Sequence, residues 1–175
     1  PFYISHYGRH GSRYHSKEKA YAQPLDALRR AAGAGKLTPK GQEVLAKVEA
    51  LAEDARLRYG DLSPRGTAEH RGIAERMYAA YPGVFSTDGG RVCRVESRST
   101  LVPRCILSMA AFNERLKELN PAITTTRDAS SRYLDYMARG NSITLVHDEI
   151  EAVADSLSRA RLNSDRLVRS LVTDP

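Results

Sequence analysis

The sequence has few cysteines and no long apolar run, and each absence narrows what the chain can be. Two cysteines, Cys93 and Cys105, are too few for a disulfide framework and do not have the spacing of metal ligands. No stretch approaches the roughly 20 apolar residues that a membrane-spanning helix needs. Residues 1–6 lack the charged and apolar regions of a signal peptide, so we expect a cytosolic chain or one whose leader has been removed.

Acidic residues are absent from two windows of a chain whose net charge is +6. The first acidic residue is Glu18, and a second acid-free window covers residues 97–113. The two windows contain the basic residues Arg9, Arg13, Lys17, Arg98 and Arg104, and three of the five histidines lie in the first. A positive balance favours anionic partners. The windows would form one local anion site if the fold brings them together.

The chain has 175 residues, of which 41% are hydrophobic and 27% charged. This length and composition are typical of one globular domain or of a domain cut from something larger. Apolar patterning predicts strands over 2–6, 92–97 and 122–126, and helices over 25–32, 39–55, 64–80, 101–119, 130–138, 143–157 and 164–172. Alternating strands and helices indicate an α/β fold with a mainly parallel sheet flanked by helices. We expect an α/β core over 1–125, and over 126–175 the beginning of a helical insert or subdomain.

Helix starts are marked by Thr38-Pro39 and Ser63-Pro64, each a capping residue followed by proline in the first turn. The motifs Leu-Thr-Pro-Lys-Gly and Leu-Ser-Pro-Arg-Gly that contain them echo each other, but two matching caps do not make a repeat architecture. Ser99 or Thr100 is the expected cap of the next helix. That helix tolerates Pro103 because the proline falls in its first turn.

Arg9-His10-Gly11-Ser12-Arg13 places an imidazole between two guanidiniums directly after the first predicted strand. Guanidinium groups neutralise phosphate oxygens with paired hydrogen bonds, and an unprotonated imidazole nitrogen can attack phosphorus directly. Arg104 adds a third guanidinium in the first turn of a helix, where backbone amides also favour an anion. The carboxyl ends of parallel strands gather on one edge of a sheet, so these residues could converge.

Residues 3–14, Tyr-Ile-Ser-His-Tyr-Gly-Arg-His-Gly-Ser-Arg-Tyr, resemble the signature opening of the histidine phosphatase superfamily, in particular its acid phosphatase and phytase branch. The closest resemblance is to bacterial relatives of multiple inositol polyphosphate phosphatase. Two further stretches match in order: residues 62–66 with the helix after them, and residues 99–104 followed by Ser108. The resemblance covers residues 2–120. It implies that His10 is the nucleophile and that Arg9, Arg13 and Arg104 bind the phosphate.

The sequence departs from this family in two places. His15 stands where many members have proline, which changes the stiffness of the loop. The family's general acid is a second histidine, followed by Asp or by Ala-Glu, near the end of a chain well over twice this length. His147-Asp148 is the only candidate here, and the apolar spacing around it fits a helix better than a strand. We therefore expect the segment that carries the acid to be missing from this sequence.

Several other residues have structural interpretations. His6 and His15 are expected to be structural or pocket-lining, and His70 to be a partly exposed packing residue. Ser12 has no acidic neighbour in the sequence to organise a relay with His10, so it is a loop residue that could donate to phosphate. Cys93 and Cys105 could pair if strand and helix face each other, and otherwise are small core residues.

These observations predict a phosphomonoesterase that works through a phosphohistidine, with no metal and no organic cofactor. The resemblance implies inositol polyphosphates such as phytate as substrates, inorganic phosphate as a product, and a periplasmic or secreted location. We expect no membrane partner and no nucleic-acid partner, since the tyrosines are scattered rather than arranged for stacking. Two alternatives stay open: a phosphoglycerate-mutase-like phosphotransferase, and a phosphate-binding fragment without turnover.

Overall fold

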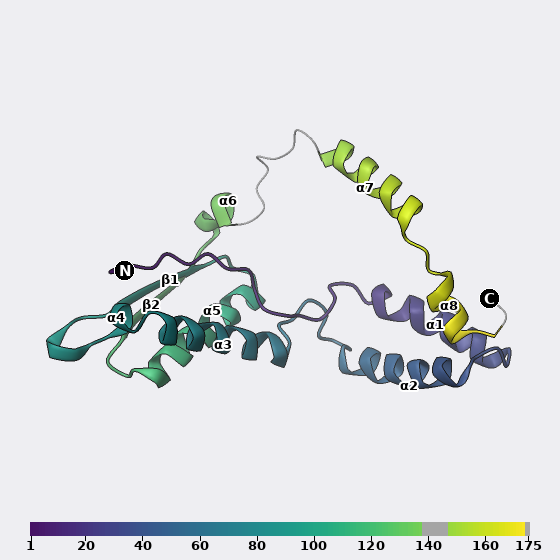
Figure 1. The fold of residues 1–175 in the computed structure, drawn as a ribbon, viewed down its shortest axis with the longest axis horizontal. Coiled ribbons are helices and arrows are strands. Elements are labelled where there is room, and N and C mark those ends of the chain that lie inside the picture. Colours follow the sequence, from purple (N-terminus) through teal and green to yellow (C-terminus); the bar gives the residue numbers. More distant parts are fainter. Residues whose placement is uncertain (138–146, 174–175) are drawn as a thin grey trace. The chain divides into compact units, whose positions relative to one another are not determined.

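The computed structural model describes residues 1–137 and 147–173 (Figure 1). Contacts divide the chain into two compact units. The sheet unit consists of Pro1–Tyr14 and Gly60–Gly140, and the helical unit of His15–Tyr59 and Asn141–Pro175. No helix in the described part of the chain is long and apolar enough to cross a membrane.

The sheet unit contains a two-stranded parallel sheet and the helices around it. Its elements are α3 (Pro64–Ala80), α4 (Pro82–Phe85), β1 (Arg94–Ser99), α5 (Pro103–Leu119), β2 (Thr124–Ala129) and α6 (Leu134–Met137), with 3₁₀ turns at Asp88–Gly90 and Ser131–Tyr133. Arg94 lies opposite Thr124 in the ladder. Helix α5 connects the two strands and packs against both of them and against α3 (Figure 1). The predicted α/β class with a parallel sheet is confirmed.

The hydrophobic core of the sheet unit lies among α3, α5 and the sheet. It consists of Ala74, Phe85, Cys93, Leu116 and Ile123, with Ile4, Met77, Tyr78, Val84, Val95 and Phe112 packed against it. Leu116 and Ile123 are fully buried. The apolar stripes predicted on the two long helices therefore face one shared core.

The helical unit contains α1 (Lys19–Gly33), α2 (Pro39–Asp54), α7 (His147–Arg161) and α8 (Asp165–Leu171). Helices α1 and α2 pack side by side, and α8 contacts α2. Thr38 caps α2, since its Oγ1 accepts the amide hydrogen of Gly41 at 3.0 Å. This start of α2 agrees with the sequence prediction, whereas α1 extends well beyond the predicted 25–32.

Three predicted boundaries need correction. Residues 2–6 are not a strand, since they pair with neither β1 nor β2, and Phe2 is 97% exposed. Apolar residues form a strand only where the backbone of a partner strand can take up their hydrogen bonds. Strands β1 and β2 each begin two residues later than predicted. Ser99 and Thr100 do not cap α5, since both are buried before it and Val102 takes the N-cap position without a side-chain bond.

The division into a core over 1–125 and a helical segment over 126–175 stays a prediction. Contacts group the residues differently, because α1 packs on α2, and α2 on α8, within the helical unit. Residues 143–146, part of the helix predicted over 143–157, lie outside the described residues. Cys93 and Cys105 are both free, Cys93 in the core and Cys105 half-buried in α5.

Candidate functional site

Residues 9–14, here named the His10 loop, are tied to the segment that leads into α3. Arg13 and Leu62 form an isolated antiparallel bridge, and the amide of Tyr14 donates to the carbonyl of Asp61 at 2.9 Å. Ser63 donates to the carbonyl of Ser12 twice, from its backbone N at 2.9 Å and from its Oγ at 2.8 Å. The same Oγ accepts the amide hydrogen of Gly66, so the residue that caps α3 also holds the loop.

Two glycines let the loop approach α3 at backbone distance. A Cβ built on Gly11 would overlap the carbonyl of Gly66 and lie 2.7 Å from its Cα. A Cβ built on Gly66 would overlap the carbonyl of Ser12 and lie 2.8 Å from its backbone N. Any side chain at either position would therefore push the loop away from the helix.

Helix α5 holds the loop from the other side through Ser108. The Ser108 Oγ accepts the amide hydrogen of Gly11 at 3.1 Å and donates to the carbonyl of Arg104, one turn earlier, at 2.8 Å. The Arg104 guanidinium makes a long contact of 3.4 Å with the carbonyl of Gly60, and its buried Nε has no partner within the described structure. The amino-terminal turns of α5 and the His10 loop thus lie against each other.

Glu69 and His70, consecutive residues of α3, contact the loop on either side of His10. The two Glu69 carboxylate oxygens accept from Ser12, at 2.8 Å from its backbone N and at 2.7 Å from its Oγ. His70 Nε2 lies 3.1 Å from the carbonyl oxygen of Arg9. Hydrogen bonds from Ser12 lower the pKa of Glu69, and burial is the main cause of the lowered pKa of His70.

The imidazole of His10 is held in one tautomer by its own loop. Its Nδ1 lies 2.8 Å from the carbonyl oxygen of Gly11. A carbonyl oxygen only accepts, so Nδ1 must carry the proton in this contact. In the neutral ring Nε2 is then unprotonated and free to act as a nucleophile.

The arginines of the site differ from those of the neighbouring helix surfaces in their ion pairing. On α3 and α5, Arg65 pairs with Glu69, Arg71 with Glu118, and Arg115 with Glu75 and Glu118. Within residues 1–137 and 147–173, Arg9, Arg13 and Arg104 take part in no such pair. Arg13 donates instead to the carbonyl of Tyr14 at 2.8 Å. These three guanidiniums thus form no described ion pair, and the acidic group that contacts the loop, Glu69, bonds to Ser12 and not to them.

The structure brings the segments of the predicted site residues together. Arg9, His10 and Arg13 lie on a loop that Ser108 connects to Arg104. His147 and Asp148 begin α7 in the helical unit, and their side chains lie outside the description. His6 stacks on Phe112 with ring centroids 5.8 Å apart, and His15 contacts Tyr21 edge-on, so both make structural contacts.

Sequence reasoning missed Glu69 and His70. His70 is only 8% exposed, not a partly exposed packing residue, and Ser12 has an acidic partner after all, from α3 rather than from its own segment. The spacing of Glu69 and His70 from Gly66 is the feature of the sequence that could have indicated this contact. Positions three and four residues after a contact point on a helix return to the same face, so a helix that touches the loop at Gly66 touches it again there.

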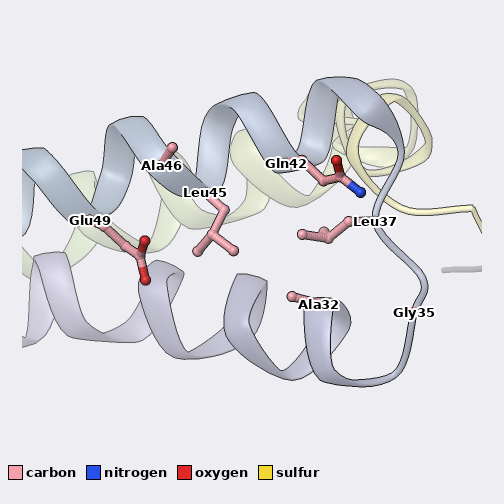
Figure 2. A pocket seen from close by; sticks show the side chains of 7 residues that line it. All are labelled: Ala32, Gly35, Leu37, Gln42, Leu45, Ala46 and Glu49. Atoms are coloured by element: carbon pink, nitrogen blue, oxygen red, sulfur yellow. The ribbon is translucent and has the colours of Figure 1, made fainter.

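Within the described residues, neither the cavity of the helical unit nor a cluster of metal ligands forms a second site. The cavity, of about 220 Å³, lies between α1 and α2 in the helical unit, and Leu37, Leu45 and Glu49 are among the residues that line it (Figure 2). Its only ionisable lining group is Glu49, whose carboxylate is paired with Arg29 at 2.9 Å. Among the residues with described placement, no cluster of His, Cys, Asp or Glu could hold a metal ion.

The structure brings the His10 loop, which carries Arg9, His10 and Arg13, next to the backbone of α5 near Arg104, within the sheet unit. A phosphate group is the anion that guanidiniums and helix amino termini recognise most specifically. Comparison with known proteins adds no family to this assignment: neither family models nor curated proteins match the chain.

Proposed function

We propose that this chain is a phosphomonoesterase whose His10 takes up the phosphoryl group of the substrate, while Arg9, Arg13 and Arg104 bind the phosphate oxygens. The observation that carries the proposal is the contact between His10 Nδ1 and the Gly11 carbonyl. It leaves Nε2 as the free nitrogen, on a loop anchored to α3 and α5. An imidazole needs this tautomer in order to attack phosphorus without a separate base.

The reaction we propose has two displacements. Nε2 of His10 forms a bond to phosphorus while the bond between phosphorus and the substrate oxygen breaks, and the departing alkoxide takes up a proton from solvent water. Water then attacks phosphorus, the N–P bond breaks, and inorganic phosphate leaves with Nε2 free again. Both transition states carry negative charge on the phosphoryl oxygens.

The three arginines, which form no described ion pair, support this assignment electrostatically. A phosphate monoester brings close to two negative charges, and unpaired guanidiniums can bind them without first breaking an internal ion pair. The Nε of Arg104 is a buried donor without a partner among the described residues, which is unusual for a group that only packs. In the first turn of α5, Pro103 has no N–H and the amides of Cys105 and Ile106 donate to the carbonyl of Val102, so the amide of Arg104 is the backbone donor that this turn can offer.

The substrate class is a second part of the proposal. The resemblance of residues 3–14, 62–66 and 99–108 favours inositol polyphosphates over other monoesters and a periplasmic or secreted setting. The proton donor for the leaving alcohol is a separate requirement. An activated aryl phosphate, whose leaving group departs as a stable anion, tests the nucleophile independently of that donor.

The test is to incubate the chain with para-nitrophenyl phosphate and to measure nitrophenolate release together with acid-labile, alkali-stable phosphate bound to the protein. We expect both with the wild-type chain and neither with His10→Ala, while inorganic phosphate competes. Circular dichroism checks that the variant is folded. An adduct that persists in His10→Ala would refute the nucleophile assignment, and a folded wild-type chain without any adduct would refute the function.

Product analysis separates the alternatives. Release of inorganic phosphate from inositol hexakisphosphate supports the phosphatase. Transfer of phosphate between positions of a phosphorylated sugar acid would identify a mutase-like phosphotransferase instead. An adduct that forms from the aryl ester, without turnover of any alkyl ester, would mean that the chain binds and accepts phosphate but lacks a working proton donor.

A further inference from the structure

Two consecutive residues of α3, Glu69 and His70, form hydrogen bonds with the backbone on both sides of the proposed nucleophile. His70 reaches the carbonyl of Arg9, immediately before His10, at 3.1 Å. Glu69 reaches Ser12, two residues after His10, at 2.8 Å from the backbone N. Neither side chain contacts the His10 ring in a described hydrogen bond. Their effect on His10 would therefore pass through the peptide backbone.

The chemistry of His70 suits a holding role. A carbonyl oxygen can only accept, so Nε2 of His70 must carry the proton and donate. Burial lowers the pKa of His70 and favours the neutral ring, which donates this bond without adding a positive charge beside the guanidiniums. His70 is 8% exposed and so cannot readily exchange the Arg9 carbonyl for water.

Glu69 binds the backbone after His10 through its ionised carboxylate. Its two oxygens accept separate hydrogen bonds from Ser12, and these bonds lower its pKa, so the carboxylate stays ionised. The side chain is 37% exposed, and Arg65 lies 3.3 Å from it. Ser12 thereby has its backbone N–H and its hydroxyl turned toward α3.

We infer that Glu69 and His70 are a positioning pair, which orients His10 for in-line attack by fixing the peptides before and after the His10-Gly11 step. The inference rests on the proposed function. Ser108 fixes the amide of Gly11 between them, so the nucleophile stands among three separate backbone anchors. A displacement of about 1 Å in a reacting group can cost on the order of 100-fold in rate. We therefore expect loss of these anchors to affect the reaction rate more than the stability of the fold.

The experiment compares two substitutions of His70 in the full chain, with para-nitrophenyl phosphate as the probe. His70→Leu removes the donor, and we expect formation of the phosphohistidine to slow by about 10- to 100-fold with little change in KM. His70→Gln offers an amide N–H at a similar reach and should restore most of the rate. If the only effect of His70→Leu were altered packing, an uncharged hydrogen-bond donor at this position would not restore the rate.

Asn113→Ala is the matched control. Asn113 is buried in α5 and bonds to Ser97 and to the carbonyl of Met109, away from the loop. Its loss should lower thermal stability and leave the rate of phosphohistidine formation near that of the wild type. Equal slowing in His70→Leu and Asn113→Ala would overturn the positioning role.

Glu69→Ala tests the same pair if His70→Leu does not fold. We expect Glu69→Ala to slow adduct formation with KM little changed, because Ser12 loses both of its contacts to α3. A folded variant with the wild-type rate would overturn the inference while leaving the phosphatase proposal intact. Absence of the adduct in the wild-type chain would instead remove the function on which the inference rests.

Discussion

At the residue scale, the contact between Gly11 and Gly66 sets how closely the His10 loop lies on α3. The Cβ positions of both residues are filled by the partner backbone, which cannot move aside as a flexible side chain could. The hydrogen bonds from Ser63 to the carbonyl of Ser12 depend on this approach. Small size at these two positions is therefore a packing requirement.

Gly11→Ala is expected to lower the free energy of unfolding of the sheet unit by about 1–3 kcal/mol, the usual cost of an added methyl group in a filled space. It should also slow formation of the phosphohistidine, because the loop must move away from α3. Urea denaturation and the aryl phosphate assay measure the two effects.

Gly33→Ala is the control for this change. Gly33 ends α1 in the helical unit, and its added Cβ meets nothing within 4 Å. The substitution should raise stability by at most about 1 kcal/mol through helix propensity and should leave the rate unchanged. A Gly11→Ala variant that behaved like Gly33→Ala would mean that the close approach in the loop is not maintained in solution.

At the element scale, two helix starts with the same sequence pattern hold two different segments. Leu37 pairs with Val172, and Thr38 Oγ1 donates to the carbonyl of Ser170 at 2.7 Å while it caps α2. Leu62 and Ser63 repeat this arrangement at α3, where the segment they hold is the His10 loop. The two similar motifs thus adopt the same structure, in which the residue that caps a helix also bonds to the carbonyl of a distant segment.

This duplication allows a matched pair of substitutions. Thr38→Ala and Ser63→Ala should each lower the free energy of unfolding by about 0.5–2 kcal/mol, because each removes an N-cap. Only Ser63→Ala should slow phosphohistidine formation, since only Ser63 holds the catalytic loop. Chemical denaturation followed by the aryl phosphate assay tests this. Equal rates in the two variants would show that the loop does not depend on its cap.

The long helices themselves were predictable from local patterns. Pro39 and Pro64 follow a capping residue, and the apolar stripes after them have helical spacing, so α2 and α3 begin where expected. Residues 2–6 failed as a strand because strand formation depends on a partner that no local pattern reveals. Either Ser99 or Thr100 was expected to cap α5, but both are buried instead, which only the packing around β1 decides.

At the scale of the whole molecule, the proposed chemistry belongs to one of the two compact units. The His10 loop, the starts of α3 and α5, and the sheet all lie in the sheet unit. The helical unit contains the cavity between α1 and α2 but no residue of the His10 loop. A ligand that binds only the folded site should therefore stabilise only the unit that contains it.

Hydrogen exchange with inorganic phosphate tests this expectation. At phosphate concentrations about 100 times the dissociation constant, linkage predicts a gain of about 2.7 kcal/mol against opening of the site. We expect slower exchange in the His10 loop and in the first turns of α3 and α5, and unchanged exchange in α1 and α2. Arg104→Ala should reduce the effect. Uniform protection of both units would point to nonspecific association with the basic chain instead.

The sequence by itself determined where α2 and α3 begin and suggested the candidate chemistry, because capping residues, apolar periodicity and the neighbours of His10 are local properties. Arg9, His10, Arg13 and Arg104 could be named from their residue types and positions alone. Only the tertiary structure decided which nitrogen of His10 is free and that Glu69, His70 and Ser108 hold its loop. The contacts of Glu69, His70 and Ser108 with the loop join residues 57 to 97 positions apart, and no pattern along the chain specifies them until the helices pack.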